Sequence, residues 1–269
     1  MLFVGIIPAR YASTRFPGKP LVDLKGKPMI QRVYEQASLV LDHVFVATDD
    51  VRIYDCVQSF GGQAVMTSEE HSCGTDRVYE AYSKLRDEHC LDIDESQIVV
   101  VNIQGDEPFI QPNQIRALME CFPTEIATLV HPFSEKDTWE DLQNPNFVKV
   151  AIAYKNSDHH PAILGKAIYF SRSVIPYLRK EKYDHWLQKG KYYRHIGMYA
   201  YRADVLKKIT HLPPSVLEET ECLEQLRWLE NGLTIQVALT EYASIGIDTP
   251  EDLQTAMQYL TINGNQVCH

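Results

Sequence analysis

The sequence lacks long apolar segments. Its longest uninterrupted aliphatic run is Ile98 to Val101, far below the roughly 18 residues that a bilayer-spanning helix needs. Residues 1–7 are apolar, but no basic residue precedes them, and Pro8 and Arg10 end the run below the length of a signal-peptide core. We therefore expect a cytoplasmic protein without membrane insertion.

Paired cysteines and blocks of basic residues are also missing. The six cysteines are dispersed, without a CxxC pair or a histidine at zinc spacing, so neither a disulfide framework nor a zinc cluster is expected. The 269 residues carry 26 Lys+Arg against 36 Asp+Glu, a formal net charge of −10. This balance argues against nucleic-acid partners, because proteins bind the phosphate backbone of nucleic acids mainly through clustered Lys and Arg. Any phosphate must therefore be bound at a local site.

Two common nucleotide-binding signatures are absent. No GxGxxG follows an expected strand, and GxxxxGK[ST] does not occur. A NAD-dependent oxidoreductase and a P-loop NTPase therefore lose most of their support.

The first half of the chain alternates apolar runs with helical periodicity. Expected strands are 2–7, 43–48, 63–66, 97–103, 148–154, 167–170 and 196–201, and expected helices are 29–40, 51–60, 75–88, 173–179, 204–209, 218–231 and 250–260. Alternation of this kind predicts an α/β fold with a largely parallel sheet and ligands beyond the carboxyl ends of its strands. The charged stretches 134–146 and 180–193 are expected to be excursions from the sheet.

The loop after the first expected strand combines cations with small polar residues. Arg10, Arg15 and Lys19 lie within ten positions, together with Ser13, Thr14 and Gly18 in the sequence PARYASTRFPGKPL. Cations and exposed backbone N–H groups at the end of a parallel strand suit a triphosphate. The alternative is a solvated loop whose charges contact nothing.

Two aspartates are candidate metal ligands. Asp106 follows the apolar strand 97–103, between Gly105 and Pro108, and Asp248 lies two residues before Pro250. Mg²⁺ favours one or two carboxylates together with substrate phosphates and water. Alternatively, Asp106 is a turn aspartate and Asp248 marks a helix N-terminus.

Seven motifs, in the order of a known family, run through almost the whole chain. They are IPARYASTRFPGKPL at 7–21, GTDR at 74–77, NIQGDEP at 102–108, YFSR at 169–172, RHIGMYAYR at 194–202, LEQLR at 223–227 and DTPED at 248–252. This set closely resembles the 3-deoxy-manno-octulosonate (Kdo) cytidylyltransferase family, also called CMP-Kdo synthetases.

The resemblance implies a Rossmann-like nucleotidyltransferase fold with a mostly parallel central sheet and helices on both faces, plus a smaller sugar-binding and dimerisation region. It implies one domain, with a nucleotide-binding half at 1–130 and a sugar-binding and dimerisation half at 131–269. The implied enzyme is a Mg²⁺-dependent homodimer that makes CMP-Kdo and pyrophosphate from CTP and Kdo for lipopolysaccharide synthesis.

The resemblance also implies roles for individual residues. Arg10 and Lys19 match triphosphate contacts, with Ser13 and Arg15 in the same loop; Gly74 and Arg77 match the cytidine side, and Asp106 and Asp248 match the metal carboxylates. The residues that resemble the Kdo pocket are Gln104, Arg172, His195, Tyr199, Glu224 and Gln225. Cys73 departs from the pattern, because a small polar residue is expected before the Gly-Thr pair.

Other readings of these residues stay open at this point. Arg172 reads equally well as a surface charge, His195 as a core histidine, and Glu224 with Gln225 as a solvated helix face. The activity also has alternatives: a cytidylyltransferase for another acidic sugar or an amino analogue of Kdo, a nucleotidyltransferase for another base, or a binding regulator without catalysis.

Overall fold

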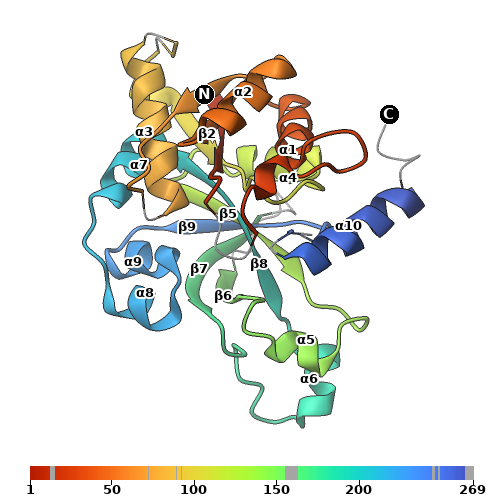
Figure 1. Ribbon diagram of the computed structural model, residues 1–269. Helices are drawn as coiled ribbons and strands as arrows, with labels where there is room; N and C mark the ends of the chain where they lie inside the picture. Colours follow the sequence, from red (N-terminus) through yellow and green to blue (C-terminus); the bar gives the residue numbers. More distant parts are fainter. Residues whose placement is uncertain are drawn as a thin grey trace. The chain divides into compact units, whose positions relative to one another are not determined.

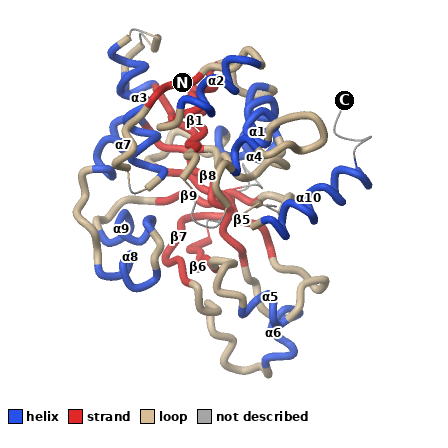
Figure 2. Tube along the Cα trace, viewed as in Figure 1, coloured by secondary structure: helices blue, strands red, loops and turns tan. Residues whose placement is uncertain are grey.

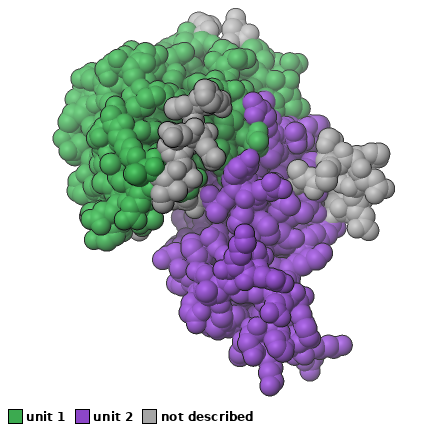
Figure 3. Space-filling view, turned by 90° about the vertical axis from the view of Figure 1, so that its right-hand side faces the viewer, with its two compact units in different colours: residues 1–115, 244–269 green, residues 116–243 purple. Residues whose placement is uncertain are grey.

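The computed structural model describes residues 1–12, 16–71, 73–88, 90–91, 93–154, 163–243, 246–247 and 249–263. The chain divides into two compact units (Figure 3). Unit 1 comprises residues 1–115 and 244–269, and unit 2 comprises residues 116–243. Each is described by itself.

Unit 1 contains a parallel sheet. Its strands are β1 (Leu2–Ala9), β2 (His43–Thr48), β3 (Ala64–Met66) and β4 (Ile98–Asn102), in the order β3-β2-β1-β4. Residues 4–7 of β1 and all of β4 are buried. Because side chains alternate between the faces of a sheet, consecutive buried residues mean that both faces are covered.

Helices alternate with these strands along the chain, as the periodicity predicts (Figures 1 and 2). They are α1 (Met29–Ser38), α2 (Val51–Ser59), α3 (Gly74–Asp87) and α10 (Pro250–Asn263), with the 3-10 turns η1 (Lys19–Leu21) and η2 (Glu95–Gln97). Helix α4 (Pro112–Met119), which the sequence analysis missed, contains the boundary between the units. The α/β class is thus confirmed.

Unit 2 contains a mixed sheet. Its strands are β5 (Ile126–Pro132), β6 (Lys149–Tyr154), β7 (Ile163–Ser171), β8 (Tyr193–Arg202) and β9 (Ile235–Leu239), in the order β8-β5-β9-β7-β6. β5 and β9 pair parallel, whereas β5–β8, β6–β7 and β7–β9 pair antiparallel. β6 also pairs with β8 at Lys149 and Arg194, so the sheet curls back on itself. The expected parallel pairing therefore describes unit 1 better than unit 2.

The helices of unit 2 correct two predictions. They are α5 (Trp139–Gln143), α6 (Trp186–Lys189), α7 (Ala203–Thr210), α8 (Val216–Glu221) and α9 (Glu224–Glu230), with η3 (Tyr183–His185). The predicted helix 173–179 does not form, because Pro176 supplies no N–H and disfavours a helical residue before it. The predicted helix 218–231 is two helices, since Cys222 between them is left-handed, with φ of 52°.

The two charged stretches also fold. Parts of 134–146 and 180–193 form α5, η3 and α6, and α5 and α6 lie side by side in Figure 1. Trp186, Leu142, Phe133 and Tyr192 form a buried cluster there, against which Trp139 and neighbouring aliphatic side chains pack. These stretches, although rich in charged residues, thus contain a small apolar core.

Candidate active site

The end of β1 begins the candidate nucleotide edge of unit 1. Arg10 follows β1 directly and is exposed. The backbone N–H of Gly18 donates to the Tyr11 carbonyl at 3.0 Å, and the Arg52 guanidinium lies 3.3 Å from the centroid of the Tyr11 ring. Gly18 has φ of 71°, and an added Cβ would lie 3.1 Å from that ring, so glycine is required there. These contacts hold Tyr11 beside Gly18 and Arg52.

Lys19 and Asp106 form an ion pair in unit 1. Their Nζ and Oδ2 atoms are 2.7 Å apart, and the side chains are 12% and 35% exposed. A Cβ added to Gly105 would lie 2.8 Å from the Pro8 carbonyl oxygen, so this glycine lets the turn after β4 approach the end of β1. Both charged residues were predicted site residues, and they meet across 87 positions of the sequence.

The same turn also meets the segment before α10. The N–H of Ile247 donates to the Asp106 carbonyl at 2.9 Å. Ile247 and side chains of α10 pack with Leu24 and Met29 in one apolar cluster. Asp248, the other predicted metal ligand, follows Ile247 in the sequence but lies outside the described residues, as do Ser13 and Arg15.

Residues of α3 hold the adjoining strand ends. The buried Arg77 donates to Thr67 Oγ1 at 2.5 Å and to Asp49 Oδ2 at 2.6 Å, so it ties the residues after β2 and β3 together. Gly74 opens α3, and a Cβ there would lie 3.7 Å from Pro8. The N-terminus of α3 therefore lies beside the end of β1, and helix N-termini favour anions.

Cys73 caps α3. Its sulfur accepts a hydrogen bond from the Asp76 N–H at 3.4 Å. Sulfur is a weak acceptor, so this departure from the expected polar residue leaves a weaker cap than serine gives. The structure also records Cys56, Cys90, Cys121 and Cys222 as free thiols.

Asp106 is the described carboxylate at this edge that could serve as a magnesium ligand. Asp106 offers a hard, partly exposed oxygen donor after the end of β4. Ile247, which precedes Asp248 in the sequence, is hydrogen-bonded to the backbone carbonyl of Asp106. In the described part of the chain, no three His, Cys, Asp or Glu side chains gather to form a metal site. This donor set suits Mg²⁺, which takes few protein carboxylates and completes its shell with phosphate and water oxygens.

His195 and Tyr199 are neighbours on β8 in unit 2. Their ring centroids are 5.3 Å apart, although four residues of regular strand span about 13 Å. The pairing register of β5 and β8 shifts between Thr128 and Leu129, and this irregularity shortens the path. His195 Nε2 lies 3.0 Å from Thr128 Oγ1, and Thr128 in turn donates to the Met198 carbonyl at 2.9 Å.

Burial keeps both rings uncharged. It lowers the pKa of His195 to about 3 and raises that of Tyr199 well above its usual value. The neutral imidazole and phenol can exchange hydrogen bonds with hydroxyl groups without altering the local charge. His195 packs edge-on against Phe170 with centroids 5.2 Å apart, so its environment resembles that of a core histidine.

Helix α9 contributes the remaining pair. Glu224 Oε1 accepts from Arg227 Nη2 at 2.9 Å, and its charge helps to raise the Tyr199 pKa. Gln225 is buried. Trp228, one turn further, packs edge-on against Tyr199 at 5.1 Å. The solvated-face alternative therefore does not describe this part of α9.

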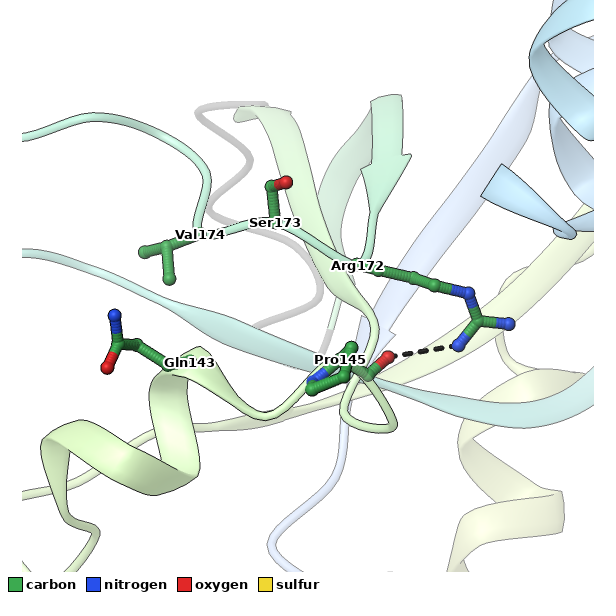
Figure 4. Close-up of a pocket in the computed structure, with 5 residues that line it drawn as sticks. All are labelled: Gln143, Pro145, Arg172, Ser173 and Val174. Atoms are coloured by element: carbon green, nitrogen blue, oxygen red, sulfur yellow. Dashed lines mark hydrogen bonds between the residues drawn. The ribbon is translucent and has the colours of Figure 1, made fainter. Parts of the chain in front are cut away.

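Arg172 follows β7 and binds backbone carbonyls. Its Nε donates to the Glu221 carbonyl at 2.7 Å, Nη1 to Pro145 at 2.9 Å and Nη2 to Cys222 at 3.2 Å. Figure 4 shows the guanidinium reaching the Pro145 carbonyl and directed away from Gln143 and Val174. These bonds use three of its five N–H donors, and its predicted grip on a sugar carboxylate stays a prediction.

The structure groups the predicted residues by unit. Unit 1 carries Arg10, Lys19, Gly74, Arg77, Gln104 and Asp106, and unit 2 carries Arg172, His195, Tyr199, Glu224 and Gln225. Gln104 is partly buried, two residues after β4.

The sequence analysis overlooked the partners that hold these side chains. Asp49 directly follows β2 and is detectable by the same strand-end argument that selected Asp106. Thr128 lies inside β5, a strand that was not predicted, and Glu221 sits within what was predicted as an unbroken helix. Neither of the latter two carries a local sequence signal.

Comparisons with known proteins identify the family of the chain. The cytidylyltransferase family model matches residues 4–235. The chain is 58% identical over 264 residues to a 3-deoxy-manno-octulosonate cytidylyltransferase of Parabacteroides distasonis, with 97% of this chain and 98% of the relative covered. A protein of the same name from Phocaeicola vulgatus is 56% identical, with 97% and 98% covered.

A solved structure is similar over the same length. It is CMP:2-keto-3-deoxy-manno-octonic acid synthetase complexed with CTP, with a TM-score of 0.82 and 38% identity, covering 98% of this chain and 100% of that one. Together with the site residues, these similarities show that the chain belongs to the 3-deoxy-manno-octulosonate cytidylyltransferase family.

Proposed function

We propose that this protein transfers the CMP group of CTP to the anomeric hydroxyl of Kdo, with Mg²⁺ as its cofactor. Membership of the family supports the reaction, and the CTP complex of a similar synthetase supports the nucleotide. The hydroxyl oxygen bonds to the α-phosphorus as the bond to the β-phosphate oxygen breaks. The hydroxyl proton passes to solvent, and the products are CMP-Kdo and pyrophosphate.

The reaction mainly needs positioning and charge neutralisation. Phosphoryl-type transfers gain little from covalent help by the protein, and negative charge develops on the departing pyrophosphate. Arg10 at the end of β1 and Lys19 beside Asp106 supply positive charge at one edge of unit 1. The Lys19–Asp106 pair is the observation that carries the proposal, because preorganised charges stabilise such a transition state.

Asp106 and Asp248 are proposed to hold the magnesium ion. The bond from Ile247 N–H to the Asp106 carbonyl supports this pairing. When bound, Mg²⁺ neutralises phosphate charge and increases the acidity of a coordinated hydroxyl. Lys19 orients the Asp106 carboxylate through its 2.7 Å contact.

The sugar residues are proposed to lie mainly in unit 2. The neutral His195 and Tyr199, together with Glu224 and Gln225, can bond sugar hydroxyls, while Arg172 supplies the cation that an acidic sugar requires. Gln104 of unit 1 is proposed as a further sugar contact.

The wider setting is also a proposal. The product is proposed to serve lipopolysaccharide synthesis, and the protein is proposed to be a cytoplasmic homodimer. The family resemblance supports both proposals. No helix in the described part of the chain is both long and apolar enough to span a bilayer.

The direct test is pyrophosphate release by purified protein with Kdo and each of the four nucleoside triphosphates. We expect release with CTP, far less with the others, and none after removal of divalent metal. An amino analogue of Kdo, offered in parallel, checks the sugar. Full turnover in metal-free protein would contradict the cofactor, and equal rates with all four nucleotides would contradict the base assignment.

A further inference from the structure

Glu221 lies at the corner where two helices of unit 2 meet the end of β7. It is the last residue of α8, Cys222 follows in a left-handed conformation, and α9 begins at Glu224. Glu221 is absent from the predicted site. Its position matters because Glu224 and Gln225 begin the next helix.

The Glu221 carboxylate binds the end of β7 through both oxygens. Oε1 accepts from Ser171 Oγ at 2.6 Å, and Oε2 accepts from the Arg172 backbone N–H at 2.9 Å. The Ser173 N–H donates to the same Ser171 oxygen at 3.0 Å. One carboxylate thus attaches α8 to the turn that follows the strand.

Arg172 completes the connection in the opposite direction. Its Nε and Nη2 donate to the carbonyls of Glu221 and Cys222, while Nη1 holds Pro145 (Figure 4). The side chain of each residue therefore binds the backbone of the other. A reciprocal arrangement fixes both position and direction, because rotation of α8 breaks bonds on both sides at once.

The left-handed residue explains why the corner needs holding. Cys222 has φ of 52° and ψ of 51°, a left-handed region that is unfavourable for a residue with a Cβ. The carbonyl of this residue accepts from Arg172. Without these bonds a continuous helix competes with the corner, as the sequence periodicity itself predicts for 218–231.

The Glu221 carboxylate also interacts with other polar side chains of unit 2. The side chain of Lys149 is fully buried, and this burial lowers its pKa. The negative charge of Glu221 raises the pKa of Lys149, whereas the positive charges of Arg172 and Arg194 lower it. Lys149 pairs with Ser171 across the β6–β7 ladder, and its Nζ donates to the Asn144 carbonyl at 2.9 Å. Tyr169 also lies against the Glu221 carboxylate. The Glu221 carboxylate thus interacts with Lys149 and Tyr169 as well as with the end of β7.

We propose that Glu221 is a positioning residue for the acidic sugar: by fixing the corner before α9, it places Glu224 and Gln225 for binding. The inference rests on the proposed function and adds a residue that contacts the backbone and side chains of the site but not the reacting atoms. It predicts a defect on the sugar side alone.

The test compares Glu221→Ala with Glu219→Ala, a matched exposed glutamate of the same helix. Steady-state kinetics give kcat and the KM values for Kdo and CTP, and melting temperature reports folding. We expect Glu221→Ala to raise the KM for Kdo by roughly tenfold or more, with the KM for CTP within about twofold of wild type. Glu219→Ala should match wild type in every value.

Two milder variants keep the test valid if Glu221→Ala folds poorly. Glu221→Gln retains a carbonyl that accepts from the Arg172 N–H, so it should recover most of the Kdo affinity. Ser171→Ala removes one of the two partners of the carboxylate and should raise the KM for Kdo by about threefold.

An unchanged KM for Kdo in a folded Glu221→Ala or Ser171→Ala enzyme overturns the inference, as does an equal rise in both KM values. Absence of turnover in the wild type contradicts the proposed function instead. The two failures are therefore distinguishable.

Discussion

The candidate nucleotide edge of unit 1 and the candidate sugar residues of unit 2 are held by different kinds of contact. At the nucleotide edge, aspartates that follow the ends of parallel strands pair directly with cations: Asp106 with Lys19 and Asp49 with Arg77. In unit 2, His195 and Tyr199 lie within β8 among aromatic rings and are uncharged.

This difference follows the chemistry proposed for each region. A triphosphate and its metal require fixed charge, whereas sugar hydroxyls are recognised by groups that both donate and accept hydrogen bonds. Altering charge at the nucleotide edge should therefore reduce the rate, and altering the neutral residues should change stability and sugar affinity.

The largest expected effect comes from Asp106→Asn. The amide keeps the size of the side chain but loses the charge that pairs with Lys19 and is proposed to hold the metal, so kcat should fall on the order of 10³-fold. Asp87→Asn, which alters an exposed residue at the end of α3, is the control. Retained activity with a lowered melting temperature would show that Asp106 serves only the turn.

Lys19→Ala should follow, with a loss of about 2–4 kcal/mol of transition-state stabilisation, or roughly 30- to 1000-fold in rate. Lys27→Ala disrupts an exposed pair with Glu35 in the same region and should leave turnover unchanged. An unaltered rate at saturating CTP in Lys19→Ala would show that Lys19 does not stabilise the departing pyrophosphate.

The lowered pKa of His195 predicts that the free energy of unfolding depends on pH. Because burial lowers the pKa of His195 from 6.5 to about 3, the unfolded chain binds a proton more readily than the folded one between these values. Stability should therefore fall as the pH drops below 6.5, by up to about 2 kcal/mol at pH 5 from this group.

The comparison of wild type with His195→Gln isolates that contribution. Chemical denaturation at pH 7 and pH 5 should show a smaller loss of unfolding free energy in the variant. Equal losses in both proteins would mean that His195 is protonated in the folded state.

The smallest expected effect is a gain from Cys73→Ser. The hydroxyl is a stronger acceptor for the Asp76 N–H than the sulfur 3.4 Å away, so the free energy of unfolding should rise by about 0.5–1 kcal/mol. Thermal melting with steady-state kinetics checks it; destabilisation would show that another contact of the thiol dominates.

The sequence predicts unit 1 better than unit 2 for identifiable reasons. Asp106 and Lys19 are detectable because parallel strands deliver their following loops to one edge, and the strand pattern is visible in continuous apolar runs. In unit 2 the left-handed Cys222 interrupts a helical period that has no glycine or proline to mark the break. The contacts of Glu221 and Arg172 that accompany this break join residues about 50 positions apart.

Local composition also conceals the small apolar cluster of unit 2. Lysines and acids fill 134–146 and 180–193, yet Trp186 and Leu142 are buried together. In the sequence each stretch is dominated by its charged residues. The apolar cluster forms only when the two stretches come together in the fold.

The division of substrates between the two regions is tested most directly by Arg172→Lys. Lysine keeps the charge but not the forked geometry that grips a carboxylate or spans three carbonyls. Calorimetric titration should give a CTP affinity within about twofold of wild type, while the KM for Kdo rises by roughly tenfold or more. A parallel loss of CTP affinity, or an unchanged KM for Kdo, would contradict the account.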